Sequence, residues 1–238
     1  MSAIGPISSP VSVSSLLALG ARLWYRKILL GTNPVAYWRV DEPSGTSAVD
    51  ATGNGHTGAY YNTPTLGVAG LLAGDTDTAV TFAAASNQYM SVPDAVGLRM
   101  PGAIALWVKT TQAALAFFVS KCVPSTSGWE IQLNADGTVS VIVHSAGAYT
   151  PLNGSVGVHD GNPHFIVAQV DGSNMSLYID GALDRSGAGV MVAGTTQITF
   201  GTRSGIGYSY SGTIDEPAIW NRALTLIEIA NLYTAGKG

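Results

Sequence analysis

Along most of this chain, apolar and polar residues alternate in short runs, a pattern typical of β-strands with one buried face. Ala36, Trp38 and Val40 alternate in this way near the start of the chain. Further short β-rich runs lie at Ala79–Ala83, Gln88–Val92, Ala103–Lys109, Leu115–Lys121, Trp129–Leu133, Thr138–His144, His164–Val170, Met175–Asp180, Gln197–Gly201 and Gly212–Trp220. The pattern predicts about ten or eleven strands in a single all-β domain.

Glycine-containing turns separate these runs. Asn134–Gly137, Asp171-Gly172 and Asp180-Gly181 carry the Asp-Gly chemistry that tight hairpin turns require, because glycine adopts positive φ without steric cost. A long turn-rich loop, residues 41–58, follows the first run. Helical patterns occur only near the two ends, so the sequence predicts a two-sheet antiparallel sandwich with terminal helices.

The last segment, Ser211–Tyr233, combines a predicted strand with a short helix. Thr225 followed by Glu228 forms a capping box, in which each side chain accepts a hydrogen bond from a free backbone N–H of the first turn. Ile229, Leu232 and Tyr233 then form one apolar stripe that must dock on the domain. We expect Gly236 to end this helix.

The first 40 residues differ chemically from the rest, because they carry four basic residues and no acid. Residues 1–15 read as an extended arm, and Ser14 or Ser15 can cap a following helix. This helix docks either on its own domain or on another protein. The candidate assembly anchors are Leu16, Leu19, Arg22, Leu23, Trp24, Arg26 and Lys27. We therefore divide the chain into an anchor, residues 1–31, and a sandwich, residues 32–238.

Charge excludes several classes of protein. The basic residues follow and interrupt the first apolar run, which is the wrong order for a signal peptide and too early for a membrane span. The net charge of −4 does not favour nucleic-acid binding. Only 11% of the residues are charged, against roughly 25% in an average protein. The single cysteine, Cys122, lies in an apolar run and is expected to be a buried structural thiol.

Five segments in order resemble the laminin-G-like, concanavalin A-like jelly-roll family of phage virion and bacterial surface proteins. The matching segments are Asn33–Gly58, Thr81–Ala95, Ala103–Thr111, Asp160–Asp184 and Ser211–Gly236. The resemblance implies a jelly-roll sandwich and covers nearly everything after Tyr25. It says less about function, because members of this family bind glycans, bind proteins or serve as structural modules.

The resemblance also implies one structural Ca²⁺, which takes hard oxygen ligands. The matching positions are Asp50, with Asn54 and His56 through carbonyl oxygens, and Asp215 or Glu216. Alternatively, Asp50 and Asn54 stabilise turns, and Asp215-Glu216 is a hydrogen-bonded pair within a strand.

We do not expect an enzyme. Glycan-cleaving enzymes need two carboxyl groups on either side of one bond. Glu130 stands alone in its run, Glu228 caps a helix, and adjacent strand residues Asp215 and Glu216 would point to opposite faces. The histidines show no metal-ligand spacing, and no nucleophile-elbow motif precedes a helix.

For binding, the candidate surface is the glycine-rich loop 204–212. Its tyrosines, Tyr208 and Tyr210, could stack on sugar rings together with Tyr149 and Trp129. Alternatively, these tyrosines pack over the edge of the sandwich or against a neighbouring subunit.

Three hypotheses follow. The first is a non-catalytic structural and binding module of a virion, such as a phage capsid decoration protein, fastened to capsid proteins or to copies of itself through residues 1–31. The second is a lectin-like module on a bacterial cell surface that binds a surface glycan. The third, a glycan-active enzyme, requires that distant acids converge in a cleft.

Overall fold

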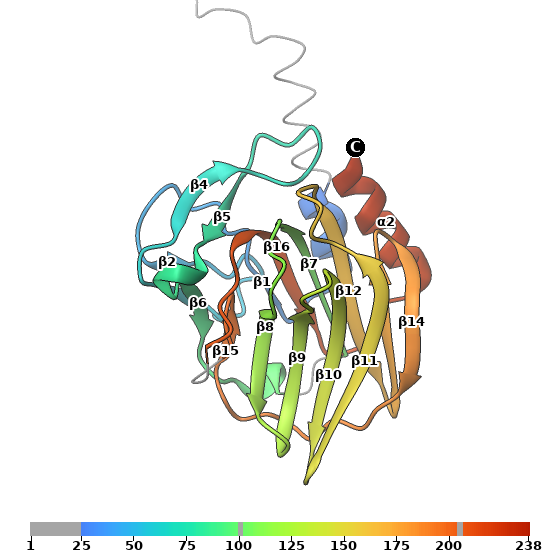
Figure 1. The fold of residues 1–238 in the computed structure, drawn as a ribbon. Helices are drawn as coiled ribbons and strands as arrows, with labels where there is room; N and C mark the ends of the chain where they lie inside the picture. The colour runs from blue at the N-terminus through green and yellow to red at the C-terminus, as the bar shows by residue number, and fades with distance from the viewer. Residues whose placement is uncertain (1–24, 100–101, 204–206) are drawn as a thin grey trace, which may run out of the picture.

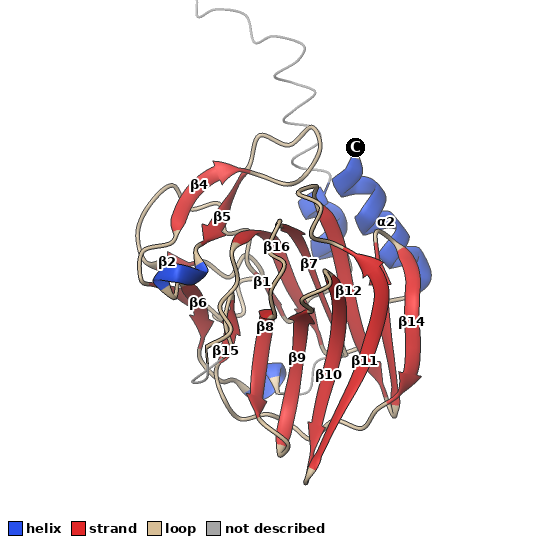
Figure 2. Cartoon of the chain, viewed as in Figure 1, coloured by secondary structure: helices blue, strands red, loops and turns tan. Residues whose placement is uncertain are grey.

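Two antiparallel sheets face each other in the computed structural model, which describes residues 25–99, 102–203 and 207–238 (Figures 1 and 2). The front sheet has the order β11 (Ala148–Gly157), β10 (Thr138–Ser145), β9 (Ser127–Leu133), β8 (Ala116–Val123), β15 (Ile198–Phe200), β6 (Tyr89–Val92), β3 (Gly58–Tyr61) and β2 (Ser47–Ala48). The expected all-β jelly-roll sandwich is confirmed.

The back sheet pairs the chain's central and closing strands. Its order is β14 (Ala182–Ala188), β13 (Asn174–Ile179), β12 (His164–Asp171), β7 (Ala103–Lys109), β16 (Gly212–Trp220), β5 (Thr78–Phe82) and β4 (Thr65–Ala69), with β1 (Ala36–Tyr37) also paired to β16. The short helices are η1 (Ala84–Ser86) and η2 (Val96–Leu98). The closing strand β16 therefore lies at the centre of its sheet and pairs with three strands.

Successive side chains of β7 point to opposite faces of the back sheet, and both of these faces are buried. Ile104, Leu106 and Val108 point between the sheets into the main core, whereas Ala105 and Trp107 belong to a second apolar cluster on the outer face. A strand buried on both sides reads as a nearly continuous apolar run, as Ala103–Lys109 does.

Two helices cover the outer face of the back sheet (Figure 2). Helix α2 (Leu226–Lys237) begins with the predicted capping box of Thr225 and Glu228 and buries Ile229 and Leu232. It runs one residue past Gly236, so our expectation that this glycine ends the helix was wrong. Gly236 instead packs against the Trp107 ring, where a side chain would collide.

A helix over residues 25–31 lies beside α2 on the same face. Tyr25 and Leu29 are buried in the outer cluster, whereas Arg26 and Lys27 are exposed. This part of the predicted anchor therefore docks on its own domain. The other anchor positions, Leu16, Leu19, Arg22, Leu23 and Trp24, lie outside the described residues.

The sequence pattern missed five short or polar strands: β2, β3, β4, β11 and β14. Strands β11 and β14 end the two sheets on the same side, and most of their residues are exposed or half-buried. Such edge strands are held by pairing with one neighbour and need no alternating apolar face, so periodicity does not detect them. Among the helices of the described part, none is long and apolar enough to cross a membrane.

Candidate functional site

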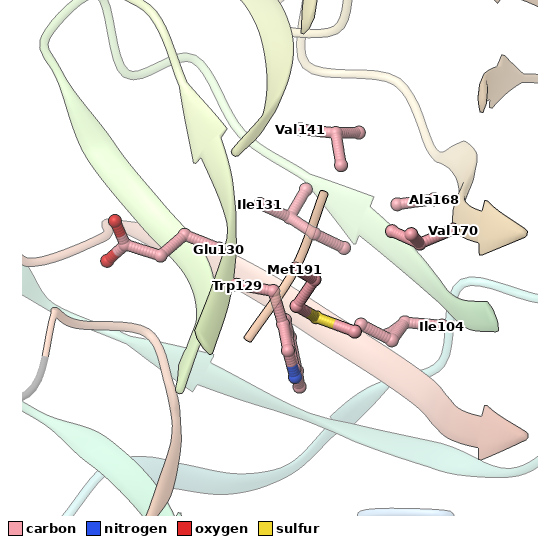
Figure 3. Close-up of a pocket in the computed structure, with 8 residues that line it drawn as sticks. All are labelled: Ile104, Trp129, Glu130, Ile131, Val141, Ala168, Val170 and Met191. Carbon is pink, nitrogen blue, oxygen red and sulfur yellow. The ribbon is translucent and has the colours of Figure 1, made fainter. Parts of the chain in front are cut away.

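Within the described residues, no helix covers the outer face of the front sheet, where buried polar side chains lie beside apolar Ile142. Neighbouring strands place Ser91, Thr199, Ser120 and Glu130 opposite one another in one row. Glu130 points away from the core, and its flanking residues Trp129 and Ile131 point into it, as Figure 3 shows. We call this surface the open face.

At its centre, the buried carboxylate of Glu130 accepts four hydrogen bonds. Arg203 donates two of them from Nε and Nη2, both at 2.8 Å. Ser120 Oγ donates at 2.8 Å, and His144 Nε2 lies 2.9 Å from the second carboxylate oxygen. A two-pronged pairing between an arginine and a carboxylate fixes both groups in one geometry.

The tautomer of His144 follows from its other nitrogen. The backbone N–H of Ser125 donates to Nδ1 at 3.0 Å, so Nδ1 has no proton. Nε2 therefore carries the proton and donates it to Glu130. The carboxylate of Glu130 thus lies between the His144 ring and the Arg203 guanidinium.

The side chains of Glu130, Arg203 and His144 support two exposed tyrosines. The ring of Tyr149 lies 5.6 Å from that of His144, and the Arg203 guanidinium lies 5.1 Å above the Phe117 ring. Tyr208 then packs edge-on against Phe117, with 6.1 Å between ring centres. Tyr149 and Tyr208 are 49% and 51% exposed. A continuous chain of contacts thus holds both rings on the open face.

Beside this chain, a ladder of amides and hydroxyls lines the same face. Gln132 Nε2 donates to Asn134 Oδ1 at 2.6 Å, and Asn134 Nδ2 donates to Ser140 Oγ at 2.9 Å. Ser140 Oγ in turn donates to Asn153 Oδ1 at 2.9 Å. Gln132 and Ser140 are buried within this ladder, so only Asn134 and Asn153 are accessible beside the aromatic rings.

The chemistry of Glu130 does not suit acid catalysis. Burial alone would raise the pKa of Glu130, but its hydrogen bond from His144 and the charge of Arg203 outweigh it and hold the pKa below its usual value. The carboxylate therefore stays ionised at neutral pH. All the groups that bind its oxygens are donors, and none is the second carboxyl that glycan cleavage requires.

Cys122, Glu130 and His144 also bring three potential metal ligands within 4.8 Å of one another. These residues do not fit a cation. Burial raises the pKa of Cys122 to about 11, so its sulfur remains a thiol. Arg203 already supplies the positive charge, and His144 has no free lone pair. The prediction of a buried structural thiol at Cys122 is confirmed.

Of the four residues predicted to contact a ligand, two are inaccessible. Tyr210 is 0% exposed because its ring packs on Phe118 and its hydroxyl donates to the carbonyl oxygen of Lys109. Trp129 is 2% exposed and borders a space of about 10 Å³, room for about one water molecule (Figure 3). Placing these two residues on a binding surface was wrong. Tyr149 and Tyr208 remain accessible.

The side chains of the predicted calcium site make hydrogen bonds to other parts of the chain. Asp50 uses its carboxylate to accept hydrogen bonds from the backbone of Tyr37, Thr52 and His56, which is the turn-stabilising alternative. Asn54 donates to the carbonyl oxygen of Val35. Among the described residues, Asp50 forms no three-ligand group with Asp215 and Glu216. The calcium ion at these residues stays a prediction.

Asp215 and Glu216 do not point to opposite faces, and that expectation was wrong. A β-bulge interrupts the pairing of β16 with β7 here, and Glu216 adopts a positive φ of 53°. Both carboxyls therefore reach the outer cluster. Asp215 accepts a hydrogen bond from the N–H of Leu71 at 2.7 Å, and Glu216 accepts one from the Tyr37 hydroxyl. Burial, with repulsion between the two acids, raises the pKa of Glu216, and burial raises that of Asp215.

Sequence reasoning missed Arg203 and His144 as parts of the site and treated Glu130 as isolated. The signal available was weak: a polar residue between apolar ones in each strand, at Glu130 and at His144. Their convergence depends on strand register and on a loop 73 residues further along the chain. Neither is visible in local periodicity.

Comparisons with known proteins agree with the fold. Residues 84–230 match the family model described as the concanavalin A-like lectin/glucanases superfamily. A search of curated proteins finds no match.

Three solved structures illustrate the likeness. The binding domain of Paraclostridial Mosquitocidal Protein 1 is 16% identical with a TM-score of 0.71, covering 86% of this chain and 52% of that one. Domain 4 of AbnA, an extracellular arabinanase from Geobacillus stearothermophilus solved with arabinotriose, is 20% identical with a TM-score of 0.66, covering 84% and 98%. The receptor binding domain of botulinum neurotoxin mosaic serotype C/D is 15% identical with a TM-score of 0.63, covering 84% and 50%. The chain spans about half the length of the two toxin domains.

Proposed function

The chain belongs to the concanavalin A-like lectin/glucanases superfamily, and we propose that it is a non-catalytic module that binds carbohydrate on its open face. The observation that carries this proposal is the pair of exposed rings, Tyr149 and Tyr208, held by the buried contacts of Glu130. The proposal is also supported by the similar fold of AbnA domain 4, which was solved in complex with arabinotriose.

The physical argument rests on complementarity and rigidity. A sugar ring has apolar C–H faces and a rim of hydroxyls, so it fits an aromatic face bordered by amides and hydroxyls. Rings fixed before binding lose little side-chain entropy when the ligand arrives. The open face supplies both features through its tyrosines and through Asn134 and Asn153, which buried Ser140 holds in place by hydrogen bonds.

The absence of catalysis is part of the proposal. Glu130 is ionised and saturated with donors, and it contacts no second acid. The ligand would therefore be held and released unchanged.

The test combines Tyr149→Ala with Tyr208→Ala in one variant. We expect it to lose roughly tenfold or more in affinity for neutral glycans, because each exposed ring contributes on the order of 1 kcal/mol through contact and stacking. Isothermal titration against arabinotriose, arabinan and a panel of soluble polysaccharides measures this loss. Ile227→Ala, an exposed apolar residue on α2, serves as the control and should bind normally. Wild-type affinity in the double variant would refute a site on this face.

We further propose that the module works on a virion surface, fastened to capsid proteins or to copies of itself through residues 1–31. The observation that favours an anchor is the exposure of Arg26 and Lys27 on a helix whose Tyr25 and Leu29 are buried. This helix lies on the outer face of the back sheet, opposite the open face. An attachment there would leave the carbohydrate face directed outward. A bacterial cell surface is the alternative location for the same binding function.

Deleting residues 1–24 tests the anchor. We expect a soluble, folded protein that no longer joins its assembly, because the sandwich keeps its own core, including Tyr25 and Leu29. Circular dichroism and thermal melting report the fold, and co-sedimentation with particles reports assembly. Assembly of the truncated protein at wild-type occupancy would contradict the proposal.

A further inference from the structure

A second candidate site lies at the other edge of the sandwich, between β3 of the front sheet and β4 of the back sheet, where Tyr61 stacks on Tyr89. Their ring centres are 4.7 Å apart, and the planes differ by 5°. Tyr61 is 45% exposed and lines a groove of about 420 Å³, whereas Tyr89 does not border it. Tyr89 thus supports the ring from behind. The volume falls within the range of about 300–1,000 Å³ that is usual for small-molecule sites.

One wall of this groove is a strained turn. Asn62 and Thr63 both adopt positive φ, at 60° and 54°, and the second is β-branched, which makes this conformation costly. Two hydrogen bonds hold the turn: Gln88 Nε2 donates to the carbonyl oxygen of Thr63 at 2.8 Å, and Asn62 Nδ2 donates to that of Asn87 at 2.7 Å. The wall is therefore fixed before any ligand arrives.

The opposite wall is fixed through Glu42. Its carboxylate accepts hydrogen bonds from the Tyr60 hydroxyl and from the N–H of Val49, both at 2.7 Å. The loop between these contacts supplies Ser44 and Thr46 to the groove. Both walls thus present hydroxyl or amide groups around one exposed aromatic face.

The lining residues carry no charged side chain. The groove is bordered by serine, threonine, asparagine, proline, leucine, glycine and tyrosine residues within 43–46 and 60–66. Both carboxylate oxygens of the nearest acid along the chain, Glu42, already accept hydrogen bonds from the protein. A sialylated or sulfated ligand would find no positive partner here, so a neutral sugar fits best.

We propose that this groove is a second carbohydrate site, selective for neutral sugar units. It is separate from the site at Tyr149, because six strand spacings lie between β3 and β11, or about 28 Å. One neutral polysaccharide could then engage both sites, which would raise its overall affinity above that of either site. The lining of the groove includes neither Tyr149 nor Tyr208.

The experiment compares Tyr61→Ala with Tyr61→Phe, each in the wild-type protein and in the Tyr149→Ala/Tyr208→Ala variant. The probes are arabinotriose, cellotetraose and 3′-sialyllactose. We expect Tyr61→Ala to weaken binding of a neutral probe by roughly tenfold and Tyr61→Phe to stay within about twofold, because phenylalanine keeps the stacked face. In NMR titrations of the full chain, the amide signals of Asn62 and Thr63 should shift with the neutral probe.

Two results would overturn the second site. One is an unchanged affinity and no Asn62 or Thr63 shift for the neutral probes. The other is a preference for 3′-sialyllactose at this groove. Because Tyr61 and the Tyr149/Tyr208 pair are varied separately, loss of either site can be distinguished from loss of the other. Thermal melting excludes misfolding, and Tyr61→Phe provides the folded reference.

Discussion

Replacing Glu130 with alanine is expected to lower the free energy of unfolding by about 3–5 kcal/mol. The carboxylate is fully buried, and its removal leaves the Arg203 guanidinium and the His144 N–H without their acceptor. A buried charge without a partner costs far more than the loss of one neutral hydrogen bond. Urea unfolding followed by tryptophan fluorescence measures the change.

A matched control is Gln132→Ala, two residues along the same strand and on the same face. Gln132 is nearly buried and donates one neutral hydrogen bond, to Asn134, so its loss should cost only about 1 kcal/mol. Glu130→Gln keeps the shape but not the charge and should fall between the two. If Glu130→Ala were no more destabilising than Gln132→Ala, the buried ion pair would not hold this face together.

The second large effect is expected at Gly128, where alanine should cost about 4 kcal/mol or more. Gly128, the second residue of β9, has a φ of 97°, and an added Cβ would overlap the carbonyl oxygen of Lys121 on β8. The carbonyl oxygen of Lys121 belongs to the backbone of β8, which is paired with β9. It therefore cannot move aside without breaking the hydrogen bonds between these two strands. The same row contains Cys122, His144 and Tyr149, so the open face would distort with it.

Gly147→Ala separates the cost of a positive φ from the cost of the steric overlap. Gly147 has a similar φ of 79°, but nothing lies within 4 Å of its added Cβ. Its substitution should therefore show the cost of the backbone conformation alone, about 1 kcal/mol. Melting temperature and the yield of soluble protein measure both variants. Equal costs at Gly128 and Gly147 would show that the collision is relieved by small shifts.

The Glu130 and Gly128 variants should affect binding as well as stability. The exposed rings of Tyr149 and Tyr208 are held by contacts that pass through His144, Glu130, Arg203 and Phe117. Variants that keep the fold but break this chain should bind glycans more weakly, because the rings lose their fixed positions.

The sequence by itself determined the local elements and the fold class. The β-rich runs of β7 to β10 and the capping box at Thr225 and Glu228 depend on neighbours in the chain, so they were predicted correctly. Trp129 was assigned to the binding surface as an aromatic residue, but its side chain points into the core.

The tertiary structure decided the rest. The bulge at Glu216 brought two adjacent acids to the same side of a strand, against the period of two. Tyr208, with a positive φ of 59°, is exposed, whereas Tyr210 is buried two residues later. Above all, Arg203 reached Glu130 across 73 residues, and Tyr61 met Tyr89 across a strand pair. Such contacts depend on register and loop path, which are set by the packing of the whole sandwich and leave no periodic trace in the chain.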